Sequence, residues 1–132
     1  MNPIELLVVD DNAAETVLLL YALEDCPRQV NFHFARDGAE SLRVLKERTF
    51  DLVILDINLP GLSGYDVLKL YGSTGVPVVM FSASSDPQDA TRSLALGARE
   101  FVHKPIRLEA YRHAVLSMIE KWVPNRQRTA GV

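Results

Sequence analysis

The stretch FDLVILDINLPG, residues 50–61, joins an apolar run to a single carboxylate and then to a turn. Residues 52–55 are all Leu, Val or Ile, which is typical of a strand buried on both faces. Asp56 follows directly, and Pro60 with Gly61 prevents the strand from continuing. The stretch therefore predicts a carboxylate at the carboxyl end of a buried strand, where open α/β sheets bind their ligands.

Strand and helix signals alternate along the rest of the chain. Apolar runs predict strands at 4–9, 52–55, 76–81 and around 101–102, whereas residues 30–35 alternate apolar and polar side chains as an edge strand does. Helix signals start at 13, 37, 63, 86 and 108. This alternation predicts a three-layer, doubly wound α/β domain of the flavodoxin-like (βα)5 type, with a parallel sheet in the order 2-1-3-4-5.

The first helix signal gives a specific expectation about its caps and its buried face. Asn12 is the expected N-cap, and Glu15 follows three residues later as in a capping box. Val17, Leu20 and then Ala22 or Leu23 recur at helical spacing and form the expected buried face.

The composition of the 132 residues fits one compact domain, since 48% are hydrophobic and 23% are charged. A net charge of −3 gives no reason to expect a nucleic-acid partner. Cys26 is the only cysteine, which excludes an intramolecular disulfide. No apolar run approaches the roughly 18 residues of a membrane span, so we expect no membrane association and a cytoplasmic location. The domain is expected at 1–123, and a disordered tail at 124–132.

Polar groups follow four of the predicted strands at one edge of the sheet. Asp10 and Asp11 follow the first strand, Asp56 the third, Ser82 the fourth and Lys104 the fifth. Two carboxylates about 4 Å apart repel by about 4 kcal/mol at an effective dielectric constant of roughly 20, so the acidic residues need a cation. Oxygen ligands from a few carboxylates suit Mg²⁺, with Mn²⁺ as a substitute.

The same residues have the properties that phosphoryl transfer to Asp56 requires. An aspartate can form an acyl phosphate, while a metal ion and Lys104 neutralise charge on the phosphoryl oxygens and Ser82 donates a hydrogen bond. Each feature alone is common, because a strand-ending aspartate is usually a turn or cap residue. Their joint occurrence predicts a phosphoacceptor site.

With these residues in place, the chain resembles the response-regulator receiver domains of two-component signalling, the CheY-like family, from about residue 4 to residue 122. The motifs that carry the resemblance are VDDN at 9–12, LDINLPG at 55–61, Ser82-Ala83 and Lys104-Pro105. The resemblance implies that Asp56 is the phosphoacceptor. It also implies a Mg²⁺ site made by Asp10, Asp11, Asp56 and the backbone carbonyl of Asn58.

The resemblance assigns further roles to single residues. Ser82 and Lys104 hold the phosphoryl oxygens, Ser82 and Phe101 are the switch residues, and Asn58 and Ser84 lie where the rate of dephosphorylation is tuned. Ser82 stands where threonine is commoner, and Phe101 where tyrosine is frequent. Phe101 therefore excludes a signal that depends on a phenol hydroxyl, although burial of its ring remains available as a switch.

The resemblance also implies how the chain takes part in signalling. The phosphoryl group would come from phosphohistidine on a histidine kinase or a histidine phosphotransfer protein, and the chain would not be a turnover enzyme. The expected output surface is formed by the fourth helix, the fifth strand and the fifth helix, for an unknown downstream protein or for self-association. Only ten residues follow Trp122, too few for an output domain, so we expect a standalone receiver.

Three alternative functions fit parts of this pattern. A phosphatase with an aspartate nucleophile, similar to the haloacid dehalogenases, needs a second carboxylate two residues after the first, where this chain has Asn58. A flavodoxin-like electron carrier would place its flavin phosphate beside Asp10 and Asp11, which would repel it. A degenerate receiver would act only as an interaction scaffold, and the intact acidic pair, acceptor, hydroxyl and lysine are reasons against it.

Overall fold

The computed structural model describes residues 2–71 and 74–124, in which strands and helices alternate from end to end. The elements are β1 (Ile4–Val9), α1 (Ala14–Leu23), β2 (Val30–Ala35), α2 (Gly38–Glu47), β3 (Leu52–Leu55), α3 (Gly64–Tyr71), β4 (Val78–Ser82), α4 (Pro87–Ala95), β5 (Glu100–His103) and α5 (Leu108–Trp122).

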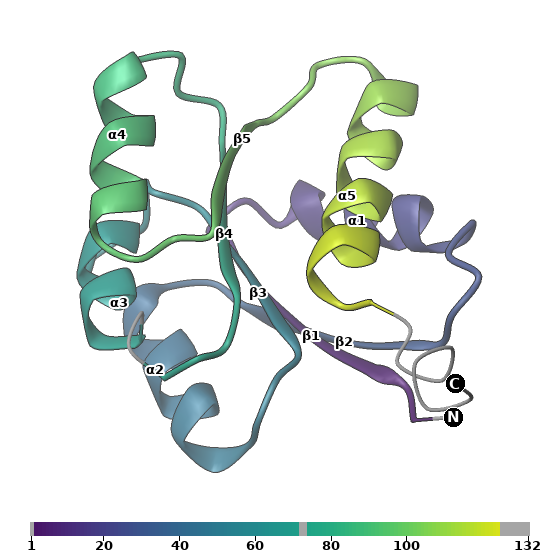
Figure 1. Ribbon diagram of the computed structural model, residues 1–132, viewed down its shortest axis with the longest axis horizontal. Coiled ribbons are helices and arrows are strands. Elements are labelled where there is room, and N and C mark those ends of the chain that lie inside the picture. Colours follow the sequence, from purple (N-terminus) through teal and green to yellow (C-terminus); the bar gives the residue numbers. More distant parts are fainter. Residues whose placement is uncertain (1, 72–73, 125–132) are drawn as a thin grey trace.

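The five strands form one parallel sheet in the order β2-β1-β3-β4-β5, which confirms the predicted fold class and strand order (Figure 1). The register pairs Val9 with Leu55, so β1 and β3 end at the same level. A hydrogen bond from the backbone N–H of Asp56 to the carbonyl of Val9 (3.0 Å) extends this pairing by one residue. The first and third strands therefore deliver Asp10 and Asp56 side by side.

The sheet lies between two layers of helices. Helices α1 and α5 cover one face, and α2, α3 and α4 cover the other (Figure 1). Each face has its own apolar core: Leu6 and Ile54 point toward α1 and α5, whereas Leu55 and Met80 point toward the opposite layer. The central strands β1, β3 and β4 are buried on both faces, as their continuous apolar sequences predict.

The expected buried face of α1 is right only in part. Ala22 is buried and Leu23 packs against the core, but Val17 and Leu20 are 68% and 51% exposed, and Glu15 and Leu19 are buried in their place. Residues 17–23 of this helix are almost all apolar, so hydrophobic periodicity does not select a face, and packing against α5 and the sheet decides it. The capping box is also absent. The Asn12 side chain does accept a hydrogen bond from the Ala14 N–H (3.0 Å), but Ala13 is the N-cap residue and the side chain of Glu15 points inward.

Other local predictions agree with the structure more closely. The carboxylates of Asp37 and Asp86 accept hydrogen bonds from the backbone N–H groups of Glu40 (2.8 Å) and Gln88 (2.9 Å), so each caps a helix at a position where the sequence gives a helix signal. Strand β4 begins at Val78 rather than at residue 76. Pro77 precedes it and has no N–H to donate to the sheet.

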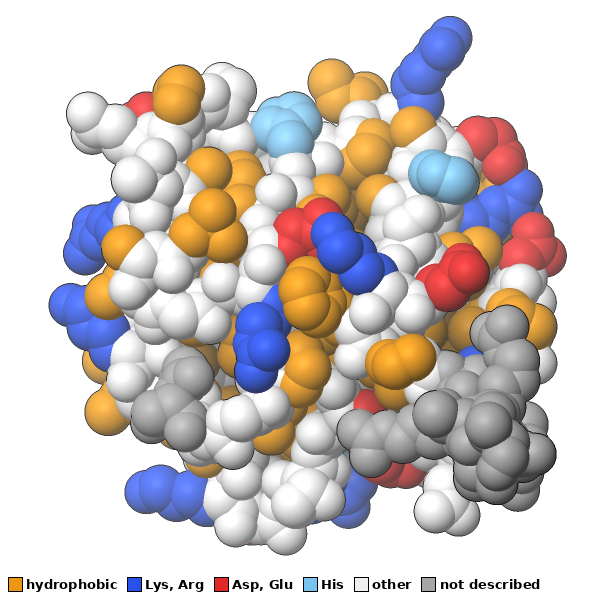
Figure 2. Space-filling model, viewed as in Figure 1, with side chains coloured by type: hydrophobic (Ala, Val, Ile, Leu, Met, Phe, Trp, Pro, Cys, Tyr) orange, Lys and Arg blue, Asp and Glu red, His pale blue; other side chains and the backbone are white. Residues whose placement is uncertain are grey.

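The surface carries charges of both signs. On the face seen in Figure 2, basic and acidic side chains are interspersed rather than gathered into one basic patch. No helix within residues 2–71 and 74–124 has the length and apolarity needed to cross a membrane. From residue 125 onward the expected tail at 124–132 lies outside the described residues, and its disorder stays a prediction.

Candidate functional site

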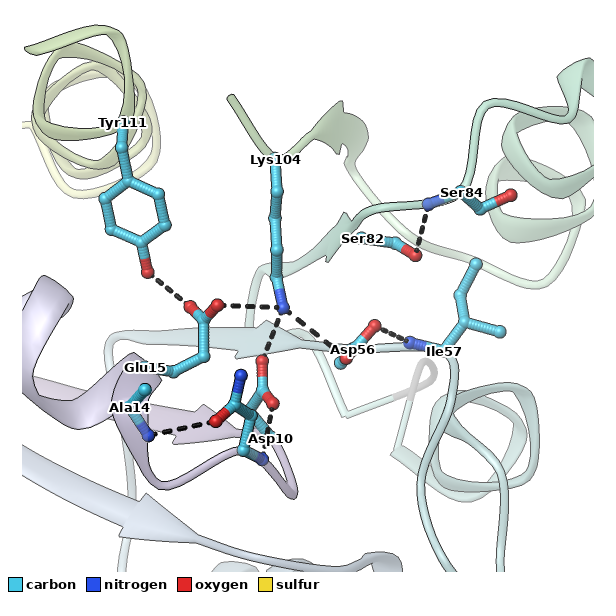
Figure 3. Close-up of polar contacts among 10 residues, drawn as sticks. Asp10, Ala14, Glu15, Asp56, Ile57, Ser82, Ser84, Lys104 and Tyr111 are labelled. Atoms are coloured by element: carbon cyan, nitrogen blue, oxygen red, sulfur yellow. Dashed lines mark hydrogen bonds and ion pairs between the residues drawn. The ribbon is translucent and has the colours of Figure 1, made fainter. Parts of the chain in front are cut away.

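Four of the predicted site residues meet at the carboxyl edge of the sheet, where all five parallel strands end (Figure 3). Asp10 comes directly after β1, Asp56 after β3 and Lys104 after β5, while Ser82 is the last residue of β4. Asp10 and Ser82 are buried, with 3% and 0% of their surface exposed. The backbone holds these residues in place, because each side chain sits at or next to the last hydrogen-bonded position of a strand.

Three carboxylates form an acidic cluster at this edge: Asp10, Asp11 and Asp56 each bring a ligand oxygen within 4.8 Å of the others. Backbone N–H groups orient two of them, that of Asn12 donating to Asp10 Oδ1 (2.9 Å) and that of Ile57 donating to Asp56 Oδ1 (2.8 Å). Three converging carboxylate oxygens, with no nitrogen or sulfur ligand among them, fit a hard divalent cation such as Mg²⁺.

Lys104 supplies the positive charge among these carboxylates. Its ammonium nitrogen lies 2.5 Å from Asp10 Oδ2 and 3.4 Å from Asp56 Oδ2. Burial alone would lower the pKa of Lys104, but the hydrogen bond to Asp10 and the negative charges of Asp56 and Glu15 outweigh it and raise the pKa above its ordinary value. The side chain therefore remains a cation at neutral pH and sits closer to Asp10 than to Asp56.

Glu15 is a member of this site that the sequence analysis missed. Its side chain is buried, with Oε1 3.4 Å from the Lys104 ammonium and Oε2 2.5 Å from the hydroxyl of Tyr111 on α5 (Figure 3). The available signal was its spacing, because Glu15 precedes Leu19 by four residues and Ala22 by seven and so shares their face of α1. Burial raises the pKa of Tyr111, and its hydrogen bond to Glu15 raises it further, so the phenol keeps its proton and donates.

Burial is also the main influence on Asp56. It raises the pKa of Asp56 above the ordinary 3.8; Lys104 opposes this effect and the nearby charge of Asp10 adds to it. In the folded protein without a divalent cation, the ionised form of Asp56 is therefore less favourable than in the unfolded chain.

This shift predicts that Asp56→Asn raises the free energy of unfolding at neutral pH in the presence of a chelator. Above the folded-state pKa, Asp56 is ionised in both states and its unfavourable contribution to folding is fully present, whereas below 3.8 it is protonated in both states and the contribution vanishes. Urea unfolding should therefore show a higher free energy of unfolding for the variant than for wild type at neutral pH, and this difference should shrink in acid. An equal gain at both pH values would contradict this cause.

Ser82 and Ser84 belong to a second network, which runs toward α3 and α4. The backbone N–H of Ser84 donates to Ser82 Oγ (3.1 Å), and the Ser84 hydroxyl donates to the carboxylate of Asp89. The hydroxyl of Tyr65 donates to the same carboxylate (2.5 Å), and burial, followed by this hydrogen bond, raises the pKa of Tyr65 to about 12. The loop after β4 is thereby tied to both helices.

The remaining predicted residues lie around the site. Asn58 is exposed two residues after Asp56, in the loop that leads to α3. Phe101 on β5 is half-buried and packs against the apolar core on the side of α2, α3 and α4. Its ring therefore lies on the face of the sheet that α2, α3 and α4 cover.

Comparison with known proteins identifies related sequences. Residues 6–116 match the family model described as the response regulator receiver domain. The DNA-binding response regulator MtrA of Mycobacterium tuberculosis is 38% identical over 105 residues, which cover 77% of this chain and 44% of that protein. The two-component response regulator ARR12 of Arabidopsis thaliana is 35% identical over 121 residues, covering 87% of this chain and 20% of that protein. The chain spans about half the length, or less, of these curated relatives.

Solved structures match over nearly the full chain. The phosphorylated cyanobacterial phytochrome response regulator RcpA has a TM-score of 0.85 and 27% identity, covering 93% of this chain and 96% of that one. The response regulator domain of CheB from Thermotoga maritima has a TM-score of 0.80 and 28% identity, covering 92% of this chain and 96% of that one. The likeness thus extends from the sequence motifs to the whole arrangement of strands and helices.

Proposed function

The chain belongs to the response regulator receiver domain family, and on that basis we propose that it accepts a phosphoryl group on Asp56. Receiver domains of two-component response regulators are phosphoacceptor signalling domains and not classical enzymes. The observation that supports Asp56 as the acceptor is its position: it lies in the acidic cluster with one carboxylate oxygen 3.4 Å from the Lys104 ammonium. Asp10, Asp11, Asp56 and the backbone carbonyl of Asn58 would hold Mg²⁺ or, in its place, Mn²⁺.

Transfer would proceed by attack of an Asp56 carboxylate oxygen on the phosphorus of a phosphohistidine. The new oxygen–phosphorus bond forms as the phosphorus–nitrogen bond breaks, and the electron pair of that bond stays on the imidazole, which takes up a proton. A divalent ion, when bound by these residues, would neutralise charge at the phosphoryl oxygens. Lys104 would contact one phosphoryl oxygen from its position beside Asp56, where its ammonium lies 3.4 Å from the carboxylate.

The Ser82 hydroxyl would bind another phosphoryl oxygen. Reorienting it breaks its hydrogen bond from the Ser84 N–H, and this connects the acceptor to the loop that precedes α4. Phe101 would respond by changing the burial of its ring, since it is half-buried on β5, the strand that contacts α4. Asn58 and Ser84 would tune the attack of water on the acyl phosphate, with the Ser84 hydroxyl first released from Asp89.

The proposed phosphodonor is a histidine kinase or a histidine phosphotransfer protein, and the proposed output surface consists of α4, β5 and α5. A downstream protein or a second copy of the chain would bind there, with residues 1–123 as the receiver domain. DNA binding is named for MtrA, which is longer than the matched region, and we propose no nucleic-acid contact for this domain. The expectation of a standalone receiver stays a prediction.

Acetyl phosphate and intact mass spectrometry test the proposal. With Mg²⁺, the protein should gain the mass of one phosphoryl group, because the acyl phosphate forms directly on Asp56; EDTA should suppress the adduct, and Mn²⁺ should restore it. Absence of an adduct with both metals would favour an interaction scaffold. Steady release of phosphate from many phosphoesters would instead favour an aspartate-dependent phosphatase, which Asn58 at the second position after Asp56 disfavours.

A further inference from the structure

We propose that Glu15, held by Tyr111, is a positioning residue that fixes the Lys104 ammonium beside Asp56. The proposal rests on phosphoryl transfer to Asp56 for its functional meaning. It assigns a purpose to a buried carboxylate, 7% exposed, that lies outside the family's motifs as they occur in this chain. Glu15 would act through Lys104 and would not contact the phosphoryl group.

One hydrogen bond and one ion pair identify the role of Glu15. Its two oxygens face different partners, with Oε2 accepting from the Tyr111 hydroxyl at 2.5 Å and Oε1 3.4 Å from the Lys104 ammonium (Figure 3). A buried carboxylate is stable only when it is paired and hydrogen-bonded. Tyr111 therefore orients the carboxylate so that its second oxygen points at Lys104.

Lys104 is shared among three carboxylates, and Glu15 differs from the other two. Asp10 and Asp56 both belong to the acidic cluster, whereas the cluster found among the described residues does not include Glu15. A cation bound by Asp10 and Asp56 would weaken the attraction between these two carboxylates and the Lys104 ammonium. Glu15 would keep its full interaction with the ammonium and hold it at the edge of the site.

Packing holds the Tyr111 side chain in place. Tyr111 is 3% exposed, and its ring centroid lies 5.3 Å from that of Phe81, which directly precedes Ser82 on β4. The Lys104 ammonium is 5.9 Å from the same Phe81 ring. The phenol is thus anchored between α5 and the sheet, and its hydroxyl has a defined direction.

Three variants and one matched control test the proposal. Glu15→Gln removes the charge at nearly constant size, Tyr111→Phe removes only the hydroxyl, and the double variant removes both. Tyr21→Phe is the control, because the Tyr21 hydroxyl donates to Glu109 (2.7 Å) and so joins the same two helices, α1 and α5, on the exposed side.

The first measurement is the rate of adduct formation with acetyl phosphate and Mg²⁺. We expect Glu15→Gln to slow it about tenfold and Tyr111→Phe about threefold, as for other residues that orient a functional group. The double variant should be no slower than Glu15→Gln, because Tyr111 acts through Glu15, and Tyr21→Phe should match wild type. Wild-type rates in Glu15→Gln, or multiplying effects in the double variant, would overturn the proposal.

The second measurement does not depend on phosphorylation. Lysines labelled with ¹³C give a signal for the ε-methylene of Lys104, which Lys104→Met identifies, while the other three lysines are exposed. A fixed ammonium gives its two ε-protons separate chemical shifts. This separation should shrink in Glu15→Gln and in Tyr111→Phe but persist in Tyr21→Phe; an unchanged separation in Glu15→Gln would overturn the positioning role. A wild-type protein that forms no adduct would overturn the proposed function instead, and the lysine signals would still decide the role of Glu15.

Discussion

Asp56→Asn is expected to remove the phosphoryl adduct at every concentration of acetyl phosphate, a loss of at least about three orders of magnitude in rate. An amide has no anionic oxygen to attack phosphorus. Asp10 is a poor substitute, because its side chain is only 4% exposed, against 12% for Asp56, and is less accessible to the phosphodonor. Intact mass after incubation with acetyl phosphate and Mg²⁺ gives the result.

The matched control for this experiment is Asp51→Asn. Asp51 precedes β3 at its opposite end, is exposed, and accepts a hydrogen bond from the backbone N–H of Glu5 (2.8 Å). The Asp51→Asn variant should form the phosphoryl adduct to the same extent as wild type. An adduct on Asp56→Asn that hydroxylamine removes would identify another carboxylate as the acceptor, whereas one that resists hydroxylamine would identify a hydroxyl such as that of Ser82.

The sequence was sufficient to place Asp10, Asp56, Ser82 and Lys104 at one edge because the backbone determines that placement. Their strands are marked by continuous apolar runs or by a clear stop, and parallel strands necessarily end on the same side of the sheet. Once the strands are identified, the position of a residue at a strand end follows without knowledge of how the helices pack. The roles of these residues as acceptor and binding groups stay predictions until phosphorylation is measured.

Glu15 could not be located in the same way. The direction of its side chain depends on the orientation of α1 about the helix axis. The apolar sequence of residues 17–23 does not determine that orientation. The structure fixes it through contacts with α5, and the hydroxyl that Glu15 meets belongs to Tyr111, 96 residues along the chain. Periodicity predicts which residues of a helix share a face, but the partner that meets that face comes from tertiary packing.

Gly64 is a second position that only the structure reveals. The sequence shows it as a small residue at the start of α3, whereas Pro60 and Gly61 carry the visible turn signal. In the structure the first turn of α3 lies directly against the loop that follows Asp56, and the Gly64 N–H donates to the carbonyl of Ile57 (2.8 Å). The absence of a side chain permits this close approach.

Gly64→Ala is therefore expected to lower the free energy of unfolding by about 3 kcal/mol or more. An added Cβ would lie 2.1 Å from the backbone oxygen of Asp56 and 2.8 Å from the Cα of Ile57. Both neighbours are backbone atoms next to a buried strand, so they cannot rotate away as a flexible side chain would. Urea unfolding at neutral pH with a chelator present measures the change.

Gly61→Ala separates this steric effect from backbone strain. Gly61 has a φ of +73° with nothing within 4 Å of an added Cβ, so its substitution should cost only about 1 kcal/mol, through the left-handed conformation alone. Equal losses in the two variants would contradict the steric account.

Because relief of the clash at Gly64 must move the backbone of Asp56, the folded Gly64→Ala protein should also form its phosphoryl adduct more slowly. A displacement of about 1 Å in a reacting group can reduce the rate on the order of a hundredfold. Gly61→Ala leaves the backbone of Asp56 in place and should keep a rate close to that of wild type.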